Sequence, residues 1–161
     1  MPATPITPAS RFFRPSITKC YWVPTIANIN APTRLELNAG TDLSKDIADI
    51  AGWMVSGQAI ATPDLNSRFV SSIPGLTNAD ESSITYYEGE DGEDARTLMP
   101  RDEIGNVVWL DGGDVAGRLM DVFPVRVLSV GKIRSMGAEA GRFTTQYSIS
   151  SEPAENVVIP A

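Results

Sequence analysis

Alternation of apolar and polar residues at a period of two, the period of a β-strand, recurs along much of this chain. The clearest case is the stretch 142–150, in which two sets of side chains alternate. The apolar set, with one threonine, is Phe143, Thr145, Tyr147 and Ile149. The polar set is Arg142, Thr144, Gln146 and Ser148. This pattern predicts a strand with one buried face and one polar face.

Further stretches show period-two alternation or are enriched in β-branched and aromatic residues, and have lengths suited to strands. They lie at 18–23, 33–37, 53–60, 68–73, 82–87, 106–110 and 119–130. Together they predict an all-β dominated fold, a β-sandwich or open barrel of about eight strands with one or two short helices. Pro124 lacks a ladder donor, so the last of these stretches is expected at a sheet edge or with a bulge there.

Two stretches have helical spacing. In 93–100, acidic residues precede Ala95 and Leu98, and Pro100 ends the pattern, so a short helix is expected. In 41–50, the spacing of Ile47 and Ile50 after Thr41 allows a second short helix, although a loop leading into the next strand remains open.

Missing residue types argue against an enzyme. The chain has no histidine, which removes the commonest general base and a common metal ligand. Cys20 is the only cysteine, so neither an internal disulfide nor a cysteine zinc site is possible, and we expect it in the core. Asp111 and Asp114 flank two glycines and are interpreted as a tight turn and not as a catalytic pair. We expect no catalytic residues, no cofactor and no metal.

The length of 161 residues suits one domain, 1–161, with an arm at each end. Residues 1–10 hold three prolines and no charged side chain, which favours an extended N-terminal arm. In 152–161, a short apolar run between two prolines is too isolated for a core strand and is expected to be a C-terminal arm. No apolar run is long enough to insert into a membrane, and a signal peptide is not expected.

The net charge of −7 comes from one window, 80–103, which has nine acidic side chains and two arginines. This excess argues against binding to nucleic acid, which requires Lys and Arg. The acidic stretch 88–94 lacks the spacing of a calcium loop and is interpreted as a solvated turn. The residues expected on this acidic surface are Asp80, Glu81, Glu88, Glu90 and Asp91.

Aromatic residues near the N-terminus form a second group. Phe12, Phe13, Tyr21 and Trp22 lie in a stretch that includes the basic residue Arg14. A platform for single-stranded nucleic acid has this composition. Core packing combined with contacts to a neighbouring subunit is the preferred interpretation, because aromatic residues and Arg are enriched at interfaces.

Many stretches, in the same order over nearly the whole chain, resemble the major tail proteins, or tail tube proteins, of siphophages that infect actinobacteria. They are RFFRPSITKCYWVPTI, AGTDLSKDIADIAGW, TPDLNSRF, DESSITYYEGED, VVWLDGGD, MDVFPVRVLSVGKIRS and SEPAENVVIPA. The resemblance implies a β-sandwich similar to the tube protein of type VI secretion systems. It also implies a virion protein, made in the bacterial cytoplasm, that forms stacked, hexameric rings through which DNA is ejected.

Other implied partners are the tape measure and tail terminator proteins, while DNA would pass without specific binding. We expect Phe12, Phe13, Arg14, Tyr21, Trp22, Val157 and Ile159 at subunit contacts. The polar strand residues Thr85, Thr144, Gln146 and Ser148 are expected to face the lumen. Two alternatives stay open at this point: a monomeric β-sandwich that binds carbohydrate or acts as an adhesin, and another virion part, such as a head–tail joining or decoration protein.

Overall fold

The computed structural model describes residues 3–92 and 94–161 and is dominated by strands, as expected. Within these residues there are ten strands and two short helices. In chain order they are β1 (Lys19–Val23), α1 (Arg34–Asn38), β2 (Thr41–Asp42), β3 (Ile47–Ala51), β4 (Val55–Thr62), β5 (Ser71–Ala79), β6 (Ser82–Tyr87), α2 (Ala95–Leu98), β7 (Ile104–Leu110), β8 (Leu119–Ile133), β9 (Arg142–Ile149) and β10 (Ala154–Val158).

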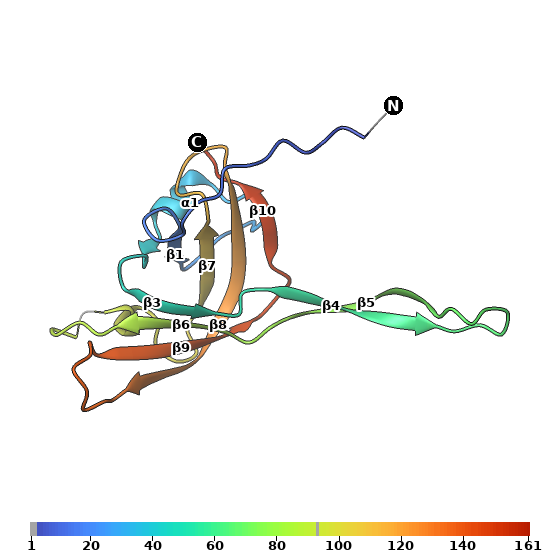
Figure 1. Cartoon of the computed structure of the whole chain (residues 1–161). Coiled ribbons are helices and arrows are strands. Elements are labelled where there is room, and N and C mark those ends of the chain that lie inside the picture. Colours follow the sequence, from blue (N-terminus) through green and yellow to red (C-terminus); the bar gives the residue numbers. More distant parts are fainter. Residues whose placement is uncertain (1–2, 93) are drawn as a thin grey trace.

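Eight of the strands form one antiparallel sheet in the order β2-β1-β7-β8-β9-β6-β3, with β10 paired to β8 outside this path. The sheet curls, so that β3, β6 and β9 run across the direction of β7 (Figure 1). Because β2 and β3 end the order and do not pair with each other, the barrel stays open between them. Strands β4 and β5 pair only with each other and form a separate ribbon.

Two hydrophobic cores lie on opposite faces of this sheet. In β7, Val107 and Trp109 face the inner core, which also contains Phe123 and Tyr147. The alternate residues of β7, Val108 and Leu110, face an outer core beneath α1 and the C-terminal segment. Burial on both faces explains why NVVWL is a nearly continuous apolar run instead of an alternating one.

The position of Pro124 in the sheet differs from the expectation. Strand β8 is central: β7 pairs with it on one side, and on the other side β10 pairs at 119–122 and β9 from Val125 onward. The carbonyl of Pro124 accepts from Ser150 N at 3.0 Å. In an antiparallel strand the N–H and C=O groups of one residue point to the same side, so the N–H that proline lacks would also point to this second side. There the pairing of β8 changes from β10 to β9. The proline is tolerated because β8 changes partners there. The bulge in this pairing lies further along, between Val127 and Ser129.

The strand expected at 33–37 is wrong, because this segment is helix α1. Thr33 caps the helix: its hydroxyl accepts from Glu36 N, and the Glu36 carboxylate accepts from Thr33 N at 2.7 Å. This reciprocal pair is a capping box. Leu37 is the buried residue of α1 and packs in the outer core.

The helix considered for 41–50 is also wrong. Ser44 N donates to Asp42 Oδ1 at 2.9 Å, which forms a turn between β2 and β3. A bulge in β3 then places Ile47 opposite Tyr86 and Ile50 opposite Ile84, and both partners belong to the inner core. A bulge that puts residues three apart on one face produces the same spacing as a helix.

The C-terminal segment is not an extended arm within its own subunit. Val157 and Val158 pair with the first residues of β8, and Ile159 N donates to Arg118 O at 2.8 Å. Val157 and Ile159 are buried in the outer core. The apolar run has no strand partner nearby in the sequence. It pairs instead with β8 at 119–122, on the side that β7 does not occupy.

The remaining predicted elements agree with the structure to within a few residues. The stretch 82–87 is β6 without change, and the short helix in 93–100 is α2. The strands predicted at 53–60 and 68–73 correspond to β4 and β5, although β5 begins only at Ser71 and continues to Ala79.

Candidate assembly surfaces

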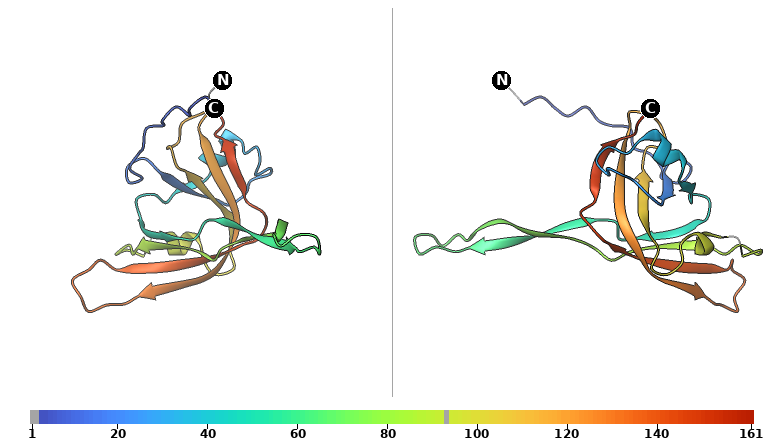
Figure 2. Two further views of the ribbon diagram at one scale, coloured as in Figure 1. Left: turned by 45° about the vertical axis from the view of Figure 1, so that its right-hand side comes forward. Right: turned by 180° about the vertical axis from the view of Figure 1, so that it is seen from behind.

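The β4–β5 hairpin projects far from the rest of the subunit (Figures 1 and 2). Its base is fixed at Trp53, where Gly52 and Trp53 both have positive φ angles, 82° and 65°. Such a φ is costly for a bulky residue, and here the surroundings hold it. Trp53 N donates to Ser82 Oγ at 3.0 Å, and its ring packs edge-on against Trp109 and Phe123 of the inner core.

Large apolar side chains of the hairpin have no second layer to pack against. Ile60 and Ile73 face each other across the ribbon, and each is half-exposed. Phe69 near the tip is 77% exposed. The other exposed large apolar side chains of this segment are Leu65, Val70 and Leu76. Isolated two-stranded hairpins are marginally stable in water, and apolar patches of this kind mark interaction sites.

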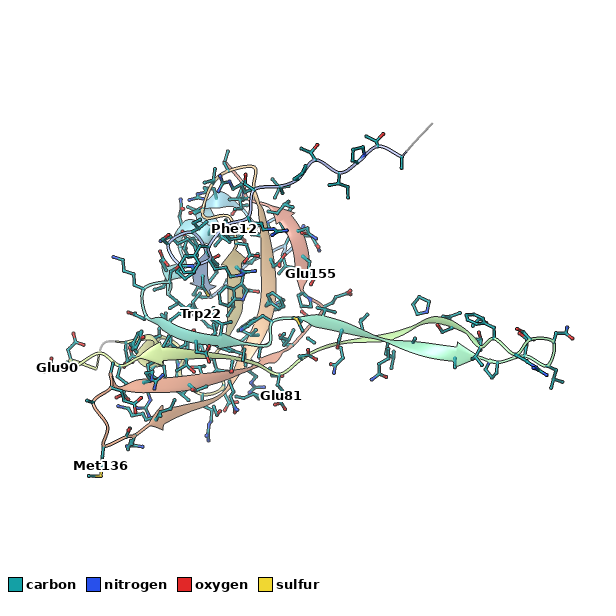
Figure 3. All side chains as sticks on the ribbon, viewed as in Figure 1. Phe12, Trp22, Glu81, Glu90, Met136 and Glu155 are labelled. Atoms are coloured by element: carbon teal, nitrogen blue, oxygen red, sulfur yellow. The ribbon has the colours of Figure 1, made fainter. Side chains whose placement is uncertain are left out.

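The N-terminal segment is a second exposed arm. Residues 3–10 are exposed, form no regular element and extend away from the subunit (Figure 1). Phe12 and Phe13 are 50% and 76% exposed, and Arg14 lies over the Phe12 ring, 6.0 Å from its centroid. Figure 3 shows Phe12 close to where this arm leaves the subunit. The rings of Phe12 and Phe13 therefore keep exposed surface for contacts outside their own subunit.

Four other residues expected at subunit contacts belong to the subunit interior. Trp22 is buried in the inner core, as Figure 3 shows, and Tyr21 packs against the outer core. Val157 and Ile159 are buried as described above. For these four the sequence showed aromatic or apolar character but not the side of the strand on which each lies.

A groove of about 790 Å³ opens between β1 and β3, where the barrel does not close. Its aromatic lining is Trp53, Trp109 and Phe123. The indole N–H of Trp109 is buried and has no acceptor among residues 3–92 and 94–161. Cys20 also lines the groove and is itself buried, as expected, and burial raises the pKa of its thiol. The groove thus has an aromatic lining, of which Trp109 and Phe123 are almost fully buried.

The polar face of β6 and β9 lies opposite the inner core. Thr85 and Thr144 face each other and their hydroxyls are 2.9 Å apart, within hydrogen-bonding distance. Gln146 Oε1 accepts from the Ser129 hydroxyl of β8 at 2.7 Å, and Ser148 lies opposite Arg126. Four residues predicted for a polar face, Thr85, Thr144, Gln146 and Ser148, therefore lie together on one sheet.

The acidic residues predicted as one surface divide between two places. Asp80 and Glu81 follow the base of the hairpin, and Glu81 is labelled there in Figure 3. Glu88, Glu90 and Asp91 lie beyond β6, where Glu90 is labelled. Glu88 forms an ion pair with Lys132 at 3.0 Å. Across residues 3–92 and 94–161, no three His, Cys, Asp or Glu side chains are grouped closely enough to hold a metal ion.

Asp114 connects the turn after β7 to α1. It accepts two hydrogen bonds from the Arg34 guanidinium, at 2.5 and 2.7 Å, and a third from the Tyr21 hydroxyl at 3.0 Å. The bonds from Arg34, followed by the bond from Tyr21, lower the pKa of Asp114 despite the opposing effect of partial burial. Burial, together with Asp114, raises the pKa of Tyr21 to about 12. The carboxylate is a structural connection as well as a turn residue.

The projecting hairpin was not predicted from the sequence, although a signal is present. Residues 55–79 contain only two charged side chains, Asp64 and Arg68, among many apolar ones. A solvated hairpin normally carries more charge, so this deficit indicates an interface.

Neither of the two described helices has the length or the apolar run needed to cross a lipid bilayer.

Comparisons with known proteins agree with this architecture. A search of curated protein sequences finds no match. A chain of the anti-feeding prophage (AFP) baseplate, in a cryo-EM structure with imposed sixfold symmetry, has a similar fold: the TM-score is 0.58 at 9% identity, with 92% of this chain and 95% of that chain covered. The family model described as phage tail tube protein matches residues 4–161. The chain therefore belongs to the phage tail tube protein family, whose members are structural components of the virion tail.

Proposed function

We propose that copies of this chain polymerise into stacked rings that form the hollow tail tube through which phage DNA is ejected. The observation that carries the proposal is the β4–β5 hairpin, which exposes large apolar side chains on a ribbon that no other described part of the subunit covers. Burying these side chains against another copy removes apolar area from water, at about 25 cal/mol per Å². Assembly thus stabilises a segment that is marginal in a single subunit.

The open barrel supports ring formation. Strands β2 and β3 end the sheet and leave backbone groups without partners along their outer edges. Head-to-tail contacts around a closed ring satisfy such edges in every subunit at once. Six subunits is the number implied by the sequence resemblance, and the baseplate that contains the similar chain was solved with sixfold symmetry.

The polar face of β6 and β9 is the surface we assign to the lumen. Its hydroxyl and amide groups, from Thr85, Thr144, Gln146 and Ser148, carry no charge that would hold phosphate. The two arginines on this face have acidic partners: Arg126 pairs with Asp102 at 3.2 Å, and Arg142 pairs with Glu139 at 2.6 Å. DNA passing such a wall meets little net attraction.

Phe12, Phe13 and Arg14 are assigned to subunit contacts, and the acidic residues at 80–91 to the rim of the lumen or the ring-stacking surface. We also propose that the phage is a siphophage of an actinobacterium and that the chain is made and assembled in the host cytoplasm. The tape measure and tail terminator proteins complete its partners. These assignments follow the sequence resemblance.

Negative-stain electron microscopy of the concentrated, purified chain tests the proposal. The unaltered protein should form hollow tubes or stacked rings. The double change Leu65→Ser and Phe69→Ser should abolish them while leaving the circular dichroism spectrum unchanged, because both side chains are exposed in the single subunit. Leu35→Ser, an exposed leucine on α1, is the control and should still assemble. A chain that stays monomeric at all concentrations contradicts the proposal.

A further inference from the structure

The groove between β1 and β3 is an unfilled aromatic site. Trp53, Trp109 and Phe123 line it, and Ile50 and Met54, which also line it, are 45% and 61% exposed. An apolar segment of another chain would remove these exposed side chains from water.

The N-terminal arm has this chemistry. Pro5 and Pro8 stand three residues apart and are exposed, and Ile6 between them is 93% exposed. A polyproline II helix has three residues per turn, so Pro5 and Pro8 lie on the same side of the arm, roughly 9 Å apart. Its backbone carbonyls form no internal hydrogen bonds and remain available as acceptors.

Proline segments with this spacing bind to grooves lined by aromatic residues. Charge adds to the match between the arm and the groove. The charged residues that line the groove are Arg14, Asp49, Asp111 and Asp121. Arg14 pairs with Asp111, which leaves a net acidic lining. The arm, residues 3–13, has no acidic side chain and one basic one, Arg11.

The arm of the same subunit is directed away from its own groove. A turn at Arg14, to whose carbonyl both Ile17 N and Thr18 N donate, includes Ser16 with a φ of 75°. From this turn the chain runs outward, as the two further views in Figure 2 also show. Fully extended as polyproline II, an arm of about eleven residues spans roughly 30 Å, enough to reach another subunit.

We propose that residues 3–11 of one copy bind in the polyproline II conformation to the groove between β1 and β3 of a second copy, with Pro5 and Pro8 against Trp53 and the exposed Ile50 and Met54, and Arg11 toward the acidic lining. This inference rests on the proposed function in that the partner is a second copy. It adds the site that receives the arm. The groove is then a specific receptor and the arm its ligand.

Cross-linking in the assembled state tests the location. Ile6 is replaced by p-benzoylphenylalanine in full-length chain, and isotopically heavy and light subunits are mixed before assembly and irradiation. Mass spectrometry should find the p-benzoylphenylalanine at position 6 linked to residues 47–54 or to Trp109 and Phe123. The linked peptides should join a heavy subunit to a light one. Links only within one subunit, or links to the hairpin or another surface in intact tubes, overturn the inference while leaving the proposed function in place.

A peptide of residues 3–11 tests the recognition without assembly. It is titrated into dilute full-length chain whose own arm carries Pro5→Ala and Pro8→Ala, and tryptophan emission is recorded. The emission should shift and saturate. A peptide with Pro8→Ala and Ala9→Pro has the same composition but places its prolines on different sides, so it should bind at least about tenfold more weakly. Equal binding of both peptides, or no shift with either, overturns the inference whether or not tubes form.

Discussion

Large apolar side chains are buried in the folded body, which is the eight-stranded sheet with its two helices, but exposed in the β4–β5 hairpin. In the body, the rings of Trp22, Tyr86 and Phe143 are all at most 1% exposed. In the hairpin, Ile60 of β4 and Ile73 of β5 are each 52% exposed. Both regions are antiparallel β structure, so strand formation alone does not decide burial. The difference teaches that burial in the body is complete within one subunit, whereas the hairpin, under the proposed function, is covered only by a neighbouring copy.

The largest expected effect comes from Trp22→Ala in the body. Removing this buried ring should lower the free energy of unfolding by about 3–5 kcal/mol, because it leaves a cavity in the inner core. Urea denaturation of the dilute chain, followed by circular dichroism, measures the change. Phe69→Ala in the hairpin is the matched change and should stay within about 0.5 kcal/mol. Equal losses for the two variants would remove the distinction between body and hairpin.

Adding a methyl group should also separate the two regions. A Cβ on Gly105 of β7 would overlap the buried Trp22 ring, whereas a Cβ on Gly57 of β4 would come no nearer than 4.0 Å to Thr77. Gly105→Ala should therefore cost about 1–3 kcal/mol. Gly57→Ala should be nearly neutral in the same urea experiment. A neutral Gly105→Ala would mean that the inner core is more loosely packed than described.

A smaller effect should depend on pH. The hydrogen bonds from Arg34 lower the pKa of Asp114 in the folded chain, so its carboxylate stabilises the body above the unfolded pKa of about 3.9. This stabilisation is lost as the pH falls through the folded pKa. Because the pair is partly exposed, Asp114→Asn should cost only about 1 kcal/mol at pH 7.

The measurement for this prediction is the urea midpoint of both proteins from pH 7 to pH 2. The gap between unaltered chain and the Asp114→Asn variant should narrow once the pH is below about 4. A gap that stays constant down to pH 2 would show that another interaction, and not the charge of Asp114, is responsible.

The smallest expected effect is local to the hairpin. Ile60→Ala removes a cross-strand pair with Ile73, which is worth about 0.2–1 kcal/mol. In the unassembled chain, amide exchange should become faster in β4 and β5 and remain unchanged in β7 and β8. Hydrogen exchange with mass spectrometry measures both. Hairpin amides as strongly protected as those of β7 in the unaltered, unassembled chain would refute the idea that the hairpin is marginal.

The fold class and several strands could be predicted because their signals are local. In 82–87 and 142–149 the alternation has a period of two with no competing helical spacing, and both are strands. Other signals were ambiguous at short range. The capping box of Thr33 and Glu36 makes 34–38 a helix in spite of the strand-like alternation of Leu35 and Leu37 with polar residues, and a bulge gives Ile47 and Ile50 a helix-like spacing.

The candidate surfaces were only partly predictable. The exposure of Phe12 and Phe13 agrees with the expectation for subunit contacts, and Thr85 and Thr144 lie together as expected of one polar face. Trp22, with the same aromatic character as its neighbours, is buried instead. Residue type states what a side chain can contact, but the side of the strand on which it lies decides what it does contact.

By itself the sequence determined the β-dominated class, the absence of histidine chemistry and the proline-rich arm, because each follows from residue types or short-range spacing. Only the tertiary structure decided that the C-terminal run joins β8, that the hairpin leaves the body and that the groove between β1 and β3 stays open. These features depend on pairing between residues far apart in the chain. Such pairing is set by which sheet edges and faces remain unoccupied once the whole chain has folded.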